Sequence, residues 1–310
     1  MESINIPING LINFNNSCYF NASLQFIKPI IDKLYCTYPN DTYIQSLLFN
    51  YYKIYTNSSE LRNKYIDIST KIKSNFAQED SCQSLELLLD EINNSFKKNI
   101  NVEFKQLIRC TQCNEYKILN EERTDTTPIL ISHELNNVNN NENILFDKFL
   151  GSILTKEQAN PSLNAYKEFK KSTNCNCSEK NIIMQTVLTN MPQFLIINTN
   201  RTKFVSINRS IKSKSLLQIS NEFNITTPDN LNNRCNGSDS TDISNEFVLS
   251  GIIVHSGSSI GSGHYIAYMK DYNTQKWYEC NDNSIQHITN FDSNSNEIQS
   301  NCHVLLYIKK

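Results

Sequence analysis

The sequence lacks the features that would direct a chain to a membrane, out of the cell or onto nucleic acid. Its 29 basic and 31 acidic residues leave a net charge of only −2, so no long-range field would attract a phosphate backbone. No apolar run approaches the ~20 residues that span a bilayer, and residues 1–14 do not resemble a secretory signal. We therefore expect a cytoplasmic or nuclear protein without a membrane or nucleic-acid partner.

Cysteine is too sparse to hold the fold together. The chain has ten cysteines among its 310 residues, whereas secreted domains stabilised by disulfides are short and much richer in them. Without an export signal, the expected compartment is a reducing one. The thiols are therefore expected to be free, bound to metal or catalytic.

The order of hydrophobic patterns predicts an α+β fold. Hydrophobic residues make up 39% of the chain, enough to bury a core. Apolar residues at helical spacing dominate 21–91, with breaks expected at Pro29 and Pro39. From residue 101 onward, short runs rich in Val, Ile, Phe and Tyr predict antiparallel strands. These runs are 102–108, 127–131, 182–188, 194–197, 247–254, 265–269, 277–280 and 304–308.

Two stretches, 136–143 and 229–244, consist mostly of Asn, Ser, Asp and other residues with little to bury. Such composition cannot contribute to a packed core, so we expect exposed loops at both places. We interpret them as insertions within one domain and not as boundaries between two domains.

Cys18 is the candidate nucleophile. It lies between the polar segment 10–17 and an apolar helical pattern, so the sequence places it at the start of a helix. The unpaired N–H groups and the positive dipole end found there stabilise a thiolate. Asn13 and its neighbours could hold an oxyanion. A single cysteine is more often a small buried hydrophobe, so the interpretation requires a partner.

A histidine that could activate the thiol follows the densest group of glycines. Four of the seven glycines lie in a short stretch that ends at His264, namely Gly251, Gly257, Gly261 and Gly263. Glycine permits positive φ and close backbone approach, which suits a loop at the edge of a cleft. A purely structural role is the alternative for any single histidine, and His255 is a rival within an apolar run.

The chain after His264 is expected to form a hairpin that brings a partner to the imidazole. A register that joins Lys270 to Lys276 places Asp282 opposite the histidine. A shift of one residue places Asn281 there instead. Either side chain could accept a hydrogen bond from the imidazole, as the third member of a Cys-His-Asn or Cys-His-Asp triad does.

These segments resemble the motifs of the ubiquitin-specific proteases. Residues 10–25 read GLINFNNSCYFNASLQ and are similar to the Cys box of that family, usually written G-L-x-N-x-G-N-T-C-Y-x-N-S-x-L-Q. Residues 247–283 resemble its His box through the groups HSG, GHY and ND. Residues 80–90 are similar to its Q-D-A-x-E-F-L helix. The resemblance extends over about residues 10–308.

The resemblance implies a papain-like cysteine protease fold. After a tail at 1–9, a single catalytic domain at 10–310 would contain a helical thumb, β fingers and an antiparallel β palm. The thumb would span about 10–98, the fingers about 99–190 and the palm about 191–310.

The resemblance also implies roles for individual residues. Cys18 would be the nucleophile, His264 the general base, Asn281 the group that orients the imidazole, and Asn13 the oxyanion donor. Asp282 is expected to point to another face, where it would support the oxyanion site or the loop.

The implied activity is that of a deubiquitinase. It would cleave the isopeptide or peptide bond after the C-terminal glycine of ubiquitin through a thioester, without a cofactor for catalysis. The ubiquitin tail would lie between thumb and palm, near Asp80. The expected partners are ubiquitin or ubiquitinated proteins, and a monomer is the default state.

Three positions depart from the family pattern. Asn15 replaces glycine, Ser17 replaces threonine, and Gln83 stands where the helix motif has glutamate. Asn15 matters most, although asparagine tolerates left-handed backbone better than most residues. A ubiquitin-binding pseudoenzyme is therefore the alternative. A structural zinc protein would leave both boxes unexplained.

Four further cysteines form a candidate metal site. Cys110 and Cys113 make a C-x-x-C pair, and Cys175 and Cys177 make a C-x-C pair with a tighter chelate. Four thiolates suit tetrahedral zinc, and the resembling family often carries such a site at the tips of its fingers. Free thiols or an empty site are the alternative. A redox pair would need a βαβ pattern, which is missing here.

Overall fold

The structure is a computed structural model of the whole chain. It describes residues 6–73, 79–119, 125–131, 135, 143–154, 156–158, 161–206, 209–227, 243–259 and 262–310. The stretches predicted as loops at 136–143 and 229–244 lie almost entirely outside these residues, as do Cys235 and the first part of the expected tail.

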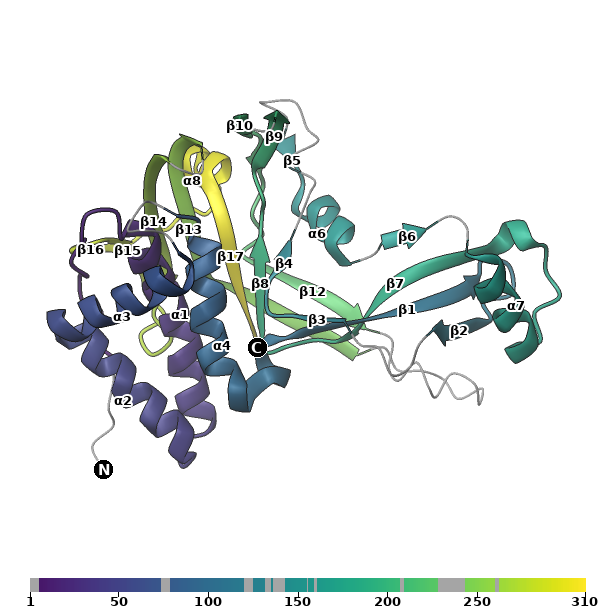
Figure 1. Cartoon of the computed structure of the whole chain (residues 1–310), viewed down its shortest axis with the longest axis horizontal. Helices are drawn as coiled ribbons and strands as arrows, with labels where there is room; N and C mark the ends of the chain where they lie inside the picture. Colours follow the sequence, from purple (N-terminus) through teal and green to yellow (C-terminus); the bar gives the residue numbers. More distant parts are fainter. Residues whose placement is uncertain are drawn as a thin grey trace.

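Helices dominate the first third of the chain, as predicted, and form one layer of the molecule (Figure 1). The side chains of Asp41 and Asn57 cap α2 and α3 by accepting hydrogen bonds from their first N–H groups. The helices are α1 (Cys18–Thr37), α2 (Thr42–Thr56), α3 (Ser58–Lys71), α4 (Ser81–Ile100), α6 (Phe146–Leu154), α7 (Leu163–Ser172), the 3₁₀ helix η1 (Glu179–Asn181) and α8 (Asn296–Asn301).

Pro29 does not end the first helix, so this prediction is wrong. Helix α1 continues through Pro29 to Thr37, and the break comes in the turn that contains Pro39. A proline in a helix interior costs ~3 kcal/mol. All side chains from 18 to 32 are buried, so packing on every side of α1 outweighs this local cost.

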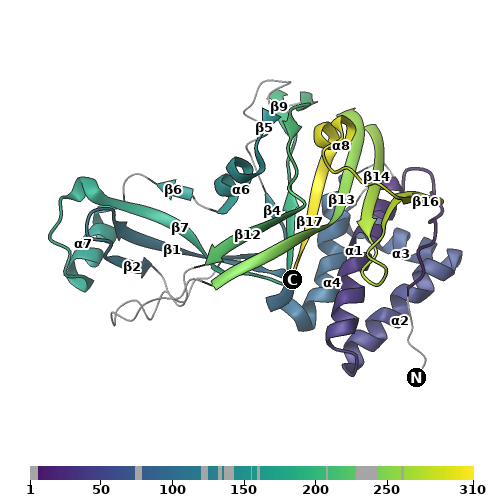
Figure 2. The same ribbon diagram turned by 180° about the vertical axis from the view of Figure 1, so that it is seen from behind.

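A central sheet packs against the helical layer. Its strands follow the order β16-β15-β14-β13-β17-β8-β4, and β12 pairs with β13. Helix α1 packs along β13 and β14 (Figure 2). The strands are β4 (Leu130–Ile131), β8 (Phe194–Asn198), β12 (Glu222–Thr227), β13 (Ile243–Ser259), β14 (Ser262–Lys270), β15 (Trp277–Asn281), β16 (Ser284–Ile288) and β17 (Cys302–Lys309).

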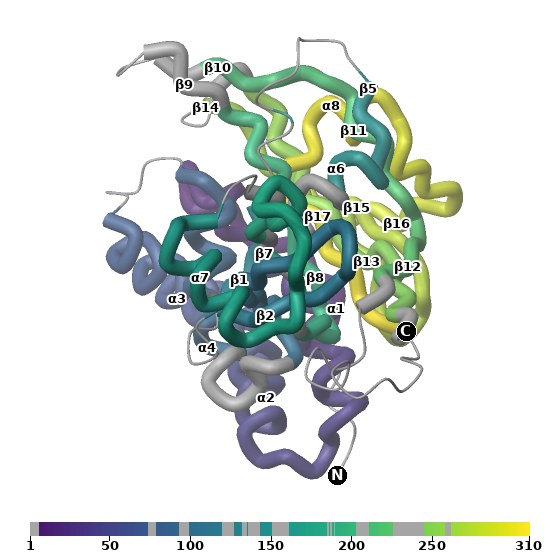
Figure 3. The backbone as a smooth tube through the Cα atoms, turned by 90° about the vertical axis from the view of Figure 1, so that its right-hand side faces the viewer, coloured from purple at the N-terminus to yellow at the C-terminus, as the bar shows by residue number. Residues whose placement is uncertain are grey.

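A second sheet extends away from the helices as an arm (Figures 1 and 2). Its order is β2-β1-β7-β6, and β3 also pairs with β1. Helix α7 packs on β1 and β2 at the far end, which faces the viewer in Figure 3. The strands are β1 (Val102–Cys110), β2 (Tyr116–Leu119), β3 (Asp125–Thr127), β6 (Lys156–Gln158) and β7 (Ile182–Asn190).

Two smaller strand pairs complete the sheets of the described residues. Strand β9 (Thr202–Ser206) pairs with β10 (Arg209–Lys212), and β5 (Asn143–Ile144) pairs in parallel with β11 (Leu216–Leu217).

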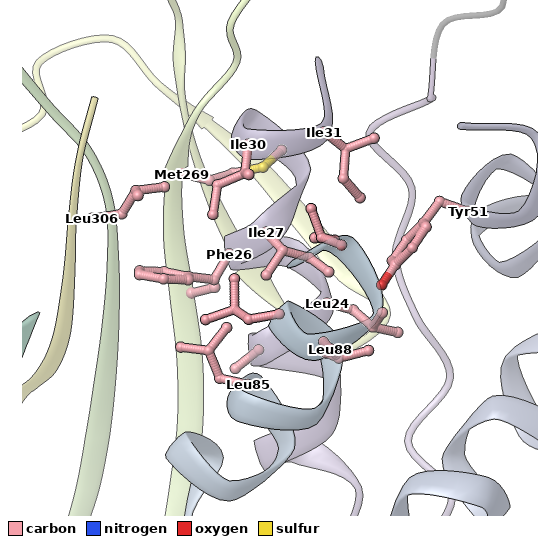
Figure 4. Packing of buried hydrophobic residues seen from close by; sticks show 14 of the residues in the cluster. Leu24, Phe26, Ile27, Ile30, Ile31, Tyr51, Leu85, Leu88, Met269 and Leu306 are labelled. Atoms are coloured by element: carbon pink, nitrogen blue, oxygen red, sulfur yellow. The ribbon is translucent and has the colours of Figure 1, made fainter. Parts of the chain in front are cut away.

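The main core lies between the helices and the central sheet (Figure 4). Its fully buried members include Leu24, Phe26, Ile27, Leu85, Leu88, Met269 and Leu306. Truncating such a leucine to alanine typically costs ~2–5 kcal/mol. This packing therefore fixes α1, with Cys18 at its start, against the strands that carry His264.

The α+β class is confirmed, and each predicted run lies in or overlaps a strand. Two features differ from the prediction. Helices α6 and α7 interrupt a region expected to be all strand, and the pairs β4–β8 and β5–β11 are parallel. The Ser162 side chain caps α7, and Phe169 of this helix is buried in the core of the arm.

In the part of the chain that the structure describes, no helix is long and apolar enough to cross a membrane.

Candidate active site

The segment before α1 is anchored to the turn between β15 and β16. The Leu11 N–H donates to the Asp282 carbonyl oxygen at 2.8 Å. Gly10 lies so close to this turn that a Cβ would come within 2.1 Å of the Asn283 carbonyl oxygen. Since only glycine permits such an approach, Gly10 allows the start of the Cys box to reach the end of β15.

A tight turn then leads to Cys18. The Asn13 side-chain oxygen accepts the Ser17 N–H at 3.1 Å, and the Ser17 hydroxyl accepts the Phe14 N–H at 2.8 Å. Asn15 has a φ of 64°, in the left-handed region. Asparagine adopts this region more readily than most residues, so Asn15 provides the backbone shape for which the resembling family uses glycine.

Cys18 is the first residue of α1 and is 4% exposed. Helix α1 packs against β14, which carries His264. The pKa of His264 is raised to about 9, and the hydrogen bond with Cys18 is the largest cause. The hydrogen bond with Asn281 raises this pKa further, whereas burial lowers it. The site therefore favours the protonated imidazole of His264 beside Cys18.

Asn281 holds the imidazole of His264. The imidazole Nε2 lies 2.7 Å from the Asn281 Oδ1. The Nε2–H therefore donates to the amide oxygen, and Nδ1 is left for the thiol. The three residues that the sequence singled out for a triad thus lie together.

Both strand registers considered from the sequence are wrong. Strand β14 pairs with β15 through Lys270 opposite Trp277. The Asp271 N–H donates to the Lys276 carbonyl at 2.9 Å, and the Asp271 side chain accepts the Thr274 N–H at 2.7 Å. This loop takes up one residue more than the predicted turn, which moves the register by one position.

The observed register makes His264 and Asn281 diagonal neighbours. Continuing the pairing of Ala267 with Cys280 puts Asn281 opposite Ile266, two residues from His264 and on the same face of the sheet. The backbones of diagonal neighbours on two paired strands are ~7–8 Å apart, so two polar side chains can reach each other. The contact that sequence reasoning sought therefore forms through a different pairing.

Gly263 shapes the approach to His264. It has a φ of 144°, and a Cβ there would lie 2.4 Å from the Ser256 carbonyl oxygen. The rival His255 is 2% exposed and stacks on Tyr265 with ring centroids 4.3 Å apart. Burial, followed by the charge of Lys212, lowers the pKa of His255 to about 3. His255 is thus a neutral packing residue.

Asp282 faces the Cys box. One carboxylate oxygen accepts from the Asn13 amide at 2.7 Å, and the other accepts from the Asn21 amide at 2.8 Å. The distance between its carboxylate and the His264 Nε2 is 3.9 Å, too long for a hydrogen bond. Asp282 therefore orients the amide of Asn13 and affects the imidazole only through its charge.

The sequence analysis gave no role to Asn21. It lies one turn after Cys18 on α1 and is 1% exposed. Its amide also donates to the Ile12 carbonyl at 3.2 Å, so it ties the turn before α1 to Asp282. An asparagine inside an apolar helical pattern was the available signal, because a buried amide needs partners.

Asp80 precedes α4 and pairs with His303 of β17. Their Oδ1 and Nε2 atoms lie 2.7 Å apart. Burial alone would raise the pKa of Asp80, but the charge and hydrogen bond of His303 bring it down to about 2. The Asp80 side chain is still 23% exposed. The two residues are 223 positions apart, so sequence reasoning missed His303.

The four cysteines of the candidate metal site meet at the far end of the arm. The Sγ atoms that lie within 4.8 Å of one another belong to Cys110, Cys113, Cys175 and Cys177. Thiolates around tetrahedral zinc are ~3.8 Å apart, so this set fits the ion with little movement. Although burial opposes it, the backbone N–H groups of Cys113 and Gln112 lower the pKa of Cys110 to about 6.

Lys170 of α7 holds the C-x-C pair in place. Its ammonium donates to the carbonyl oxygens of Cys175 and Cys177, both at 2.8 Å. The positive charge also lies 3.9 Å from the Cys175 sulfur, where it would offset part of the negative charge of four thiolates around an ion. The unpredicted helix α7 therefore supports the predicted site.

Comparison with known proteins places this geometry in a family. A profile of the ubiquitin carboxyl-terminal hydrolase family matches residues 9–307. The chain belongs to this family. Over 40 residues it is 58% identical to ubiquitin carboxyl-terminal hydrolase 25 of Arabidopsis thaliana, a match that covers 13% of this chain and 6% of that protein. It is 48% identical over 40 residues to ubiquitin carboxyl-terminal hydrolase 48 of Gallus gallus, covering 13% and 4%.

Solved structures of a SAGA DUB module contain a chain that shares the fold. The SAGA Ubp8/Sgf11/Sus1/Sgf73 DUB module bound to ubiquitin aldehyde contains a chain that matches with a TM-score of 0.65 and 16% identity. The match covers 100% of this chain and 71% of that one. The same module with monoubiquitin matches with a TM-score of 0.65 and 17% identity, at the same coverage. The expected papain-like fold is confirmed.

In this family member, the sequence-predicted residues lie in three places. One group meets where α1, β14 and β15 join, and it contains Cys18, His264, Asn281, Asn13 and Asp282. Asp80 lies at the start of α4, and the four cysteines lie at the end of the arm.

Proposed function

We propose that this chain is a thiol-dependent deubiquitinase that hydrolyses the bond after the C-terminal glycine of ubiquitin. The observation that carries the proposal is the contact of His264 with Cys18 on one side and Asn281 on the other. Nucleophilic catalysis by a thiol needs these three parts, which are the nucleophile, its base and a group that orients the base. Family membership supports ubiquitin as the substrate.

In the proposed reaction, the Cys18 thiolate attacks the carbonyl carbon of the terminal glycine. The His264 imidazolium then gives its proton to the leaving amine, and a thioester remains on Cys18. A water molecule attacks this thioester while His264 takes up one of its protons. The thiolate leaves and ubiquitin departs with a free carboxylate.

Asn13 is the proposed oxyanion donor. Its amide nitrogen carries two N–H groups, and Asp282 accepts one of them at 2.7 Å. This bond fixes the orientation of the amide and leaves a second donor for the negative oxygen of the tetrahedral intermediate. A donor oriented before the reaction is worth ~2.7–4 kcal/mol of transition-state stabilisation.

The proposed domain layout follows the arrangement of the layers. Helices α1 to α4 would form the thumb, the arm the fingers, and the central sheet the palm. The ubiquitin tail would pass between thumb and palm, near the exposed part of Asp80. A reducing cellular compartment suits a protein that needs its nucleophilic and metal-binding thiols unoxidised.

A ubiquitin carrying a thiol-reactive group at its C-terminus tests the proposal. We expect the protein with its original sequence and the Cys36→Ala variant each to form a covalent adduct with one ubiquitin per chain. Mass spectrometry measures this adduct. Cys36 is an exposed cysteine of the same helix, so this variant controls for exposure alone. No adduct in Cys18→Ala is expected, and labelling of that variant would refute Cys18 as the nucleophile.

The sequence left a ubiquitin-binding pseudoenzyme as the alternative because of Asn15. Its φ of 64° shows that the residue adopts the required backbone shape, which favours activity. A protein that binds ubiquitin but gives neither adduct nor hydrolysis would be such a pseudoenzyme.

We further propose that the four cysteines of the arm bind zinc. Replacing Cys110 and Cys113 together by serine should remove one equivalent of zinc per chain and lower the thermal stability. Structural zinc contributes ~10–16 kcal/mol of binding free energy to the folded state, so the arm should lose order. Metal analysis and thermal unfolding measure both effects, with Cys36→Ser as the matched control. Equal metal content and stability in the double variant and the control would show that this site holds no zinc.

The pH profile should reflect the raised pKa of His264. Its ordinary value is 6.5, and the folded site raises the pKa to about 9. The imidazolium, and the stability that its hydrogen bond with Cys18 gives the folded state, should therefore persist below pH 6.5 and disappear as the pH rises through about 9. We expect the basic limb of kcat/KM at about pH 9. A basic limb near pH 6.5 would mean that the imidazole titrates as in free solution.

A further inference from the structure

Asp80, Cys82 and His303 form a cluster that takes no part in the chemical steps of the proposed reaction, although the ubiquitin tail would pass near Asp80. Asp80 and Cys82 lie at the start of α4, and His303 lies on β17 in the central sheet. The His303 Nε2 is 2.7 Å from the Asp80 Oδ1 and 3.7 Å from the Cys82 Sγ. The three donor atoms all lie within 4.8 Å of one another.

This cluster does not have the geometry of a second catalytic triad. In a triad, the thiol and the orienting group occupy opposite nitrogens of the imidazole. Here both the Asp80 carboxylate and the Cys82 sulfur face the same Nε2 of His303. Three donors that converge on one point are instead typical of ligands around a metal ion.

We propose that Asp80, Cys82 and His303 bind a borderline-soft divalent cation such as Zn²⁺, in a site separate from the four cysteines of the arm. Around tetrahedral zinc, nitrogen, oxygen and sulfur ligands lie ~3.3–3.8 Å apart. The 3.7 Å distance between Nε2 and Sγ already fits, and the 2.7 Å distance between Nε2 and Oδ1 has to open by about half an ångström.

The charges of the donor set also suit a divalent ion. A carboxylate, a thiolate and a neutral imidazole carry two negative charges, so the loaded site would be neutral. This matters because Cys82 is 7% and His303 6% exposed, and an uncompensated charge at such depth is costly. The thiolate selects zinc or a similar ion over calcium and magnesium, which prefer oxygen ligands.

The site is held by rigid elements and is open on one side. The Cys82 N–H donates to the Asp80 Oδ1 at 2.8 Å, which fixes the carboxylate at the start of α4. The Cys82 thiol also contacts the Asn198 side chain of β8. Since the Asp80 side chain is 23% exposed, an ion can enter there. Three protein ligands leave a fourth position for water, so the ion would connect α4 to the central sheet.

Zinc binding by the full chain tests the proposal. After loading with Zn²⁺ and removal of loosely bound metal, Cys82→Ser should contain one equivalent less zinc than Cys302→Ser. Cys302 is the matched control because it is also a buried cysteine and directly precedes His303 in the sequence. Its sulfur contacts Arg201 and not the cluster. Comparing the two variants separates this site from the arm, whose cysteines both retain. Equal zinc content in the two folded variants would overturn the proposal.

A milder variant keeps the test valid if Cys82→Ser fails to fold. Asp80→Asn retains an acceptor for the Cys82 N–H but loses the negative charge, so it should weaken this zinc site at least roughly tenfold. Binding of Co²⁺ gives a second measurement, because a thiolate ligand produces a charge-transfer absorption. We expect this signal to fall in Asp80→Asn and to stay unchanged in Cys302→Ser. An unchanged zinc affinity and cobalt spectrum in Asp80→Asn would refute the site, whatever the protein does to ubiquitin.

Discussion

Replacement of Cys18 by alanine should abolish hydrolysis of ubiquitin conjugates and leave ubiquitin affinity nearly intact. The thiolate forms the bond to the substrate carbonyl, whereas it contributes little area to substrate binding. Loss of a nucleophile in comparable triads lowers kcat by ~10⁶, so turnover should fall below detection. Hydrolysis of a fluorogenic ubiquitin conjugate and direct ubiquitin binding measure the two quantities.

Cys36→Ala is the control for this experiment, because Cys36 is an exposed cysteine near the other end of α1. Its turnover should match that of the unmodified chain. Persistent hydrolysis in Cys18→Ala would remove the thiol-protease mechanism. Loss of ubiquitin affinity together with activity would instead show that the start of α1 had unfolded, which thermal unfolding would reveal.

Replacement of Asn281 by alanine should lower kcat by roughly 10²–10⁴-fold with little change in KM. The Asn281 Oδ1 lies 2.7 Å from the His264 Nε2, so the variant frees the ring to rotate and to change tautomer. The same bond helps to raise the pKa of His264. The basic limb of the pH profile should therefore move to lower pH in Asn281→Ala.

Asp282→Ala provides the contrast. It removes the acceptor of two amides, those of Asn13 and Asn21, so it should lower stability and weaken the oxyanion site. It should shift the basic limb less than Asn281→Ala does, because Asp282 acts on the imidazole only through its charge. A larger shift in Asp282→Ala, with Asn281→Ala near the unmodified chain, would make Asp282 the orienting residue.

Asn281→Asp distinguishes orientation from mere packing. Aspartate keeps an oxygen acceptor in nearly the same place, so most of the kcat lost in Asn281→Ala should return. Its negative charge should raise the pKa of the imidazole further and move the basic limb upward. A structural role alone would restore kcat without moving the pH profile.

Asp282 links the two halves of the candidate site. Its backbone carbonyl holds Leu11, and its carboxylate holds Asn13 and Asn21. Asp282 directly follows Asn281, the hydrogen-bond partner of His264, and also anchors the segment before α1. The position of Cys18 relative to His264 therefore depends on this short turn as well as on the packing of α1, and Gly10 allows the close approach to the turn.

Local patterns in the sequence determined much of this fold and of the site. The change from a polar segment to an apolar helical pattern placed a helix start at Cys18, and the runs of β-branched and aromatic residues placed the strands. The motifs that resemble the ubiquitin-specific proteases identified Cys18, His264 and Asn281, which the structure brings together. These signals are readable because helix starts, strand alternation and motif spacing depend on residues close together in the chain.

The tertiary structure alone decided how these elements meet. It set the register of β14 on β15, carried α1 through Pro29, and brought Asp282 to Asn13 across 269 positions and His303 to Asp80 across 223. A one-residue slip of a strand leaves its local pattern unchanged but gives every side chain new neighbours. Contacts between distant segments are selected by core packing and by the need of buried polar groups for partners, and neither condition can be evaluated before the chain is folded.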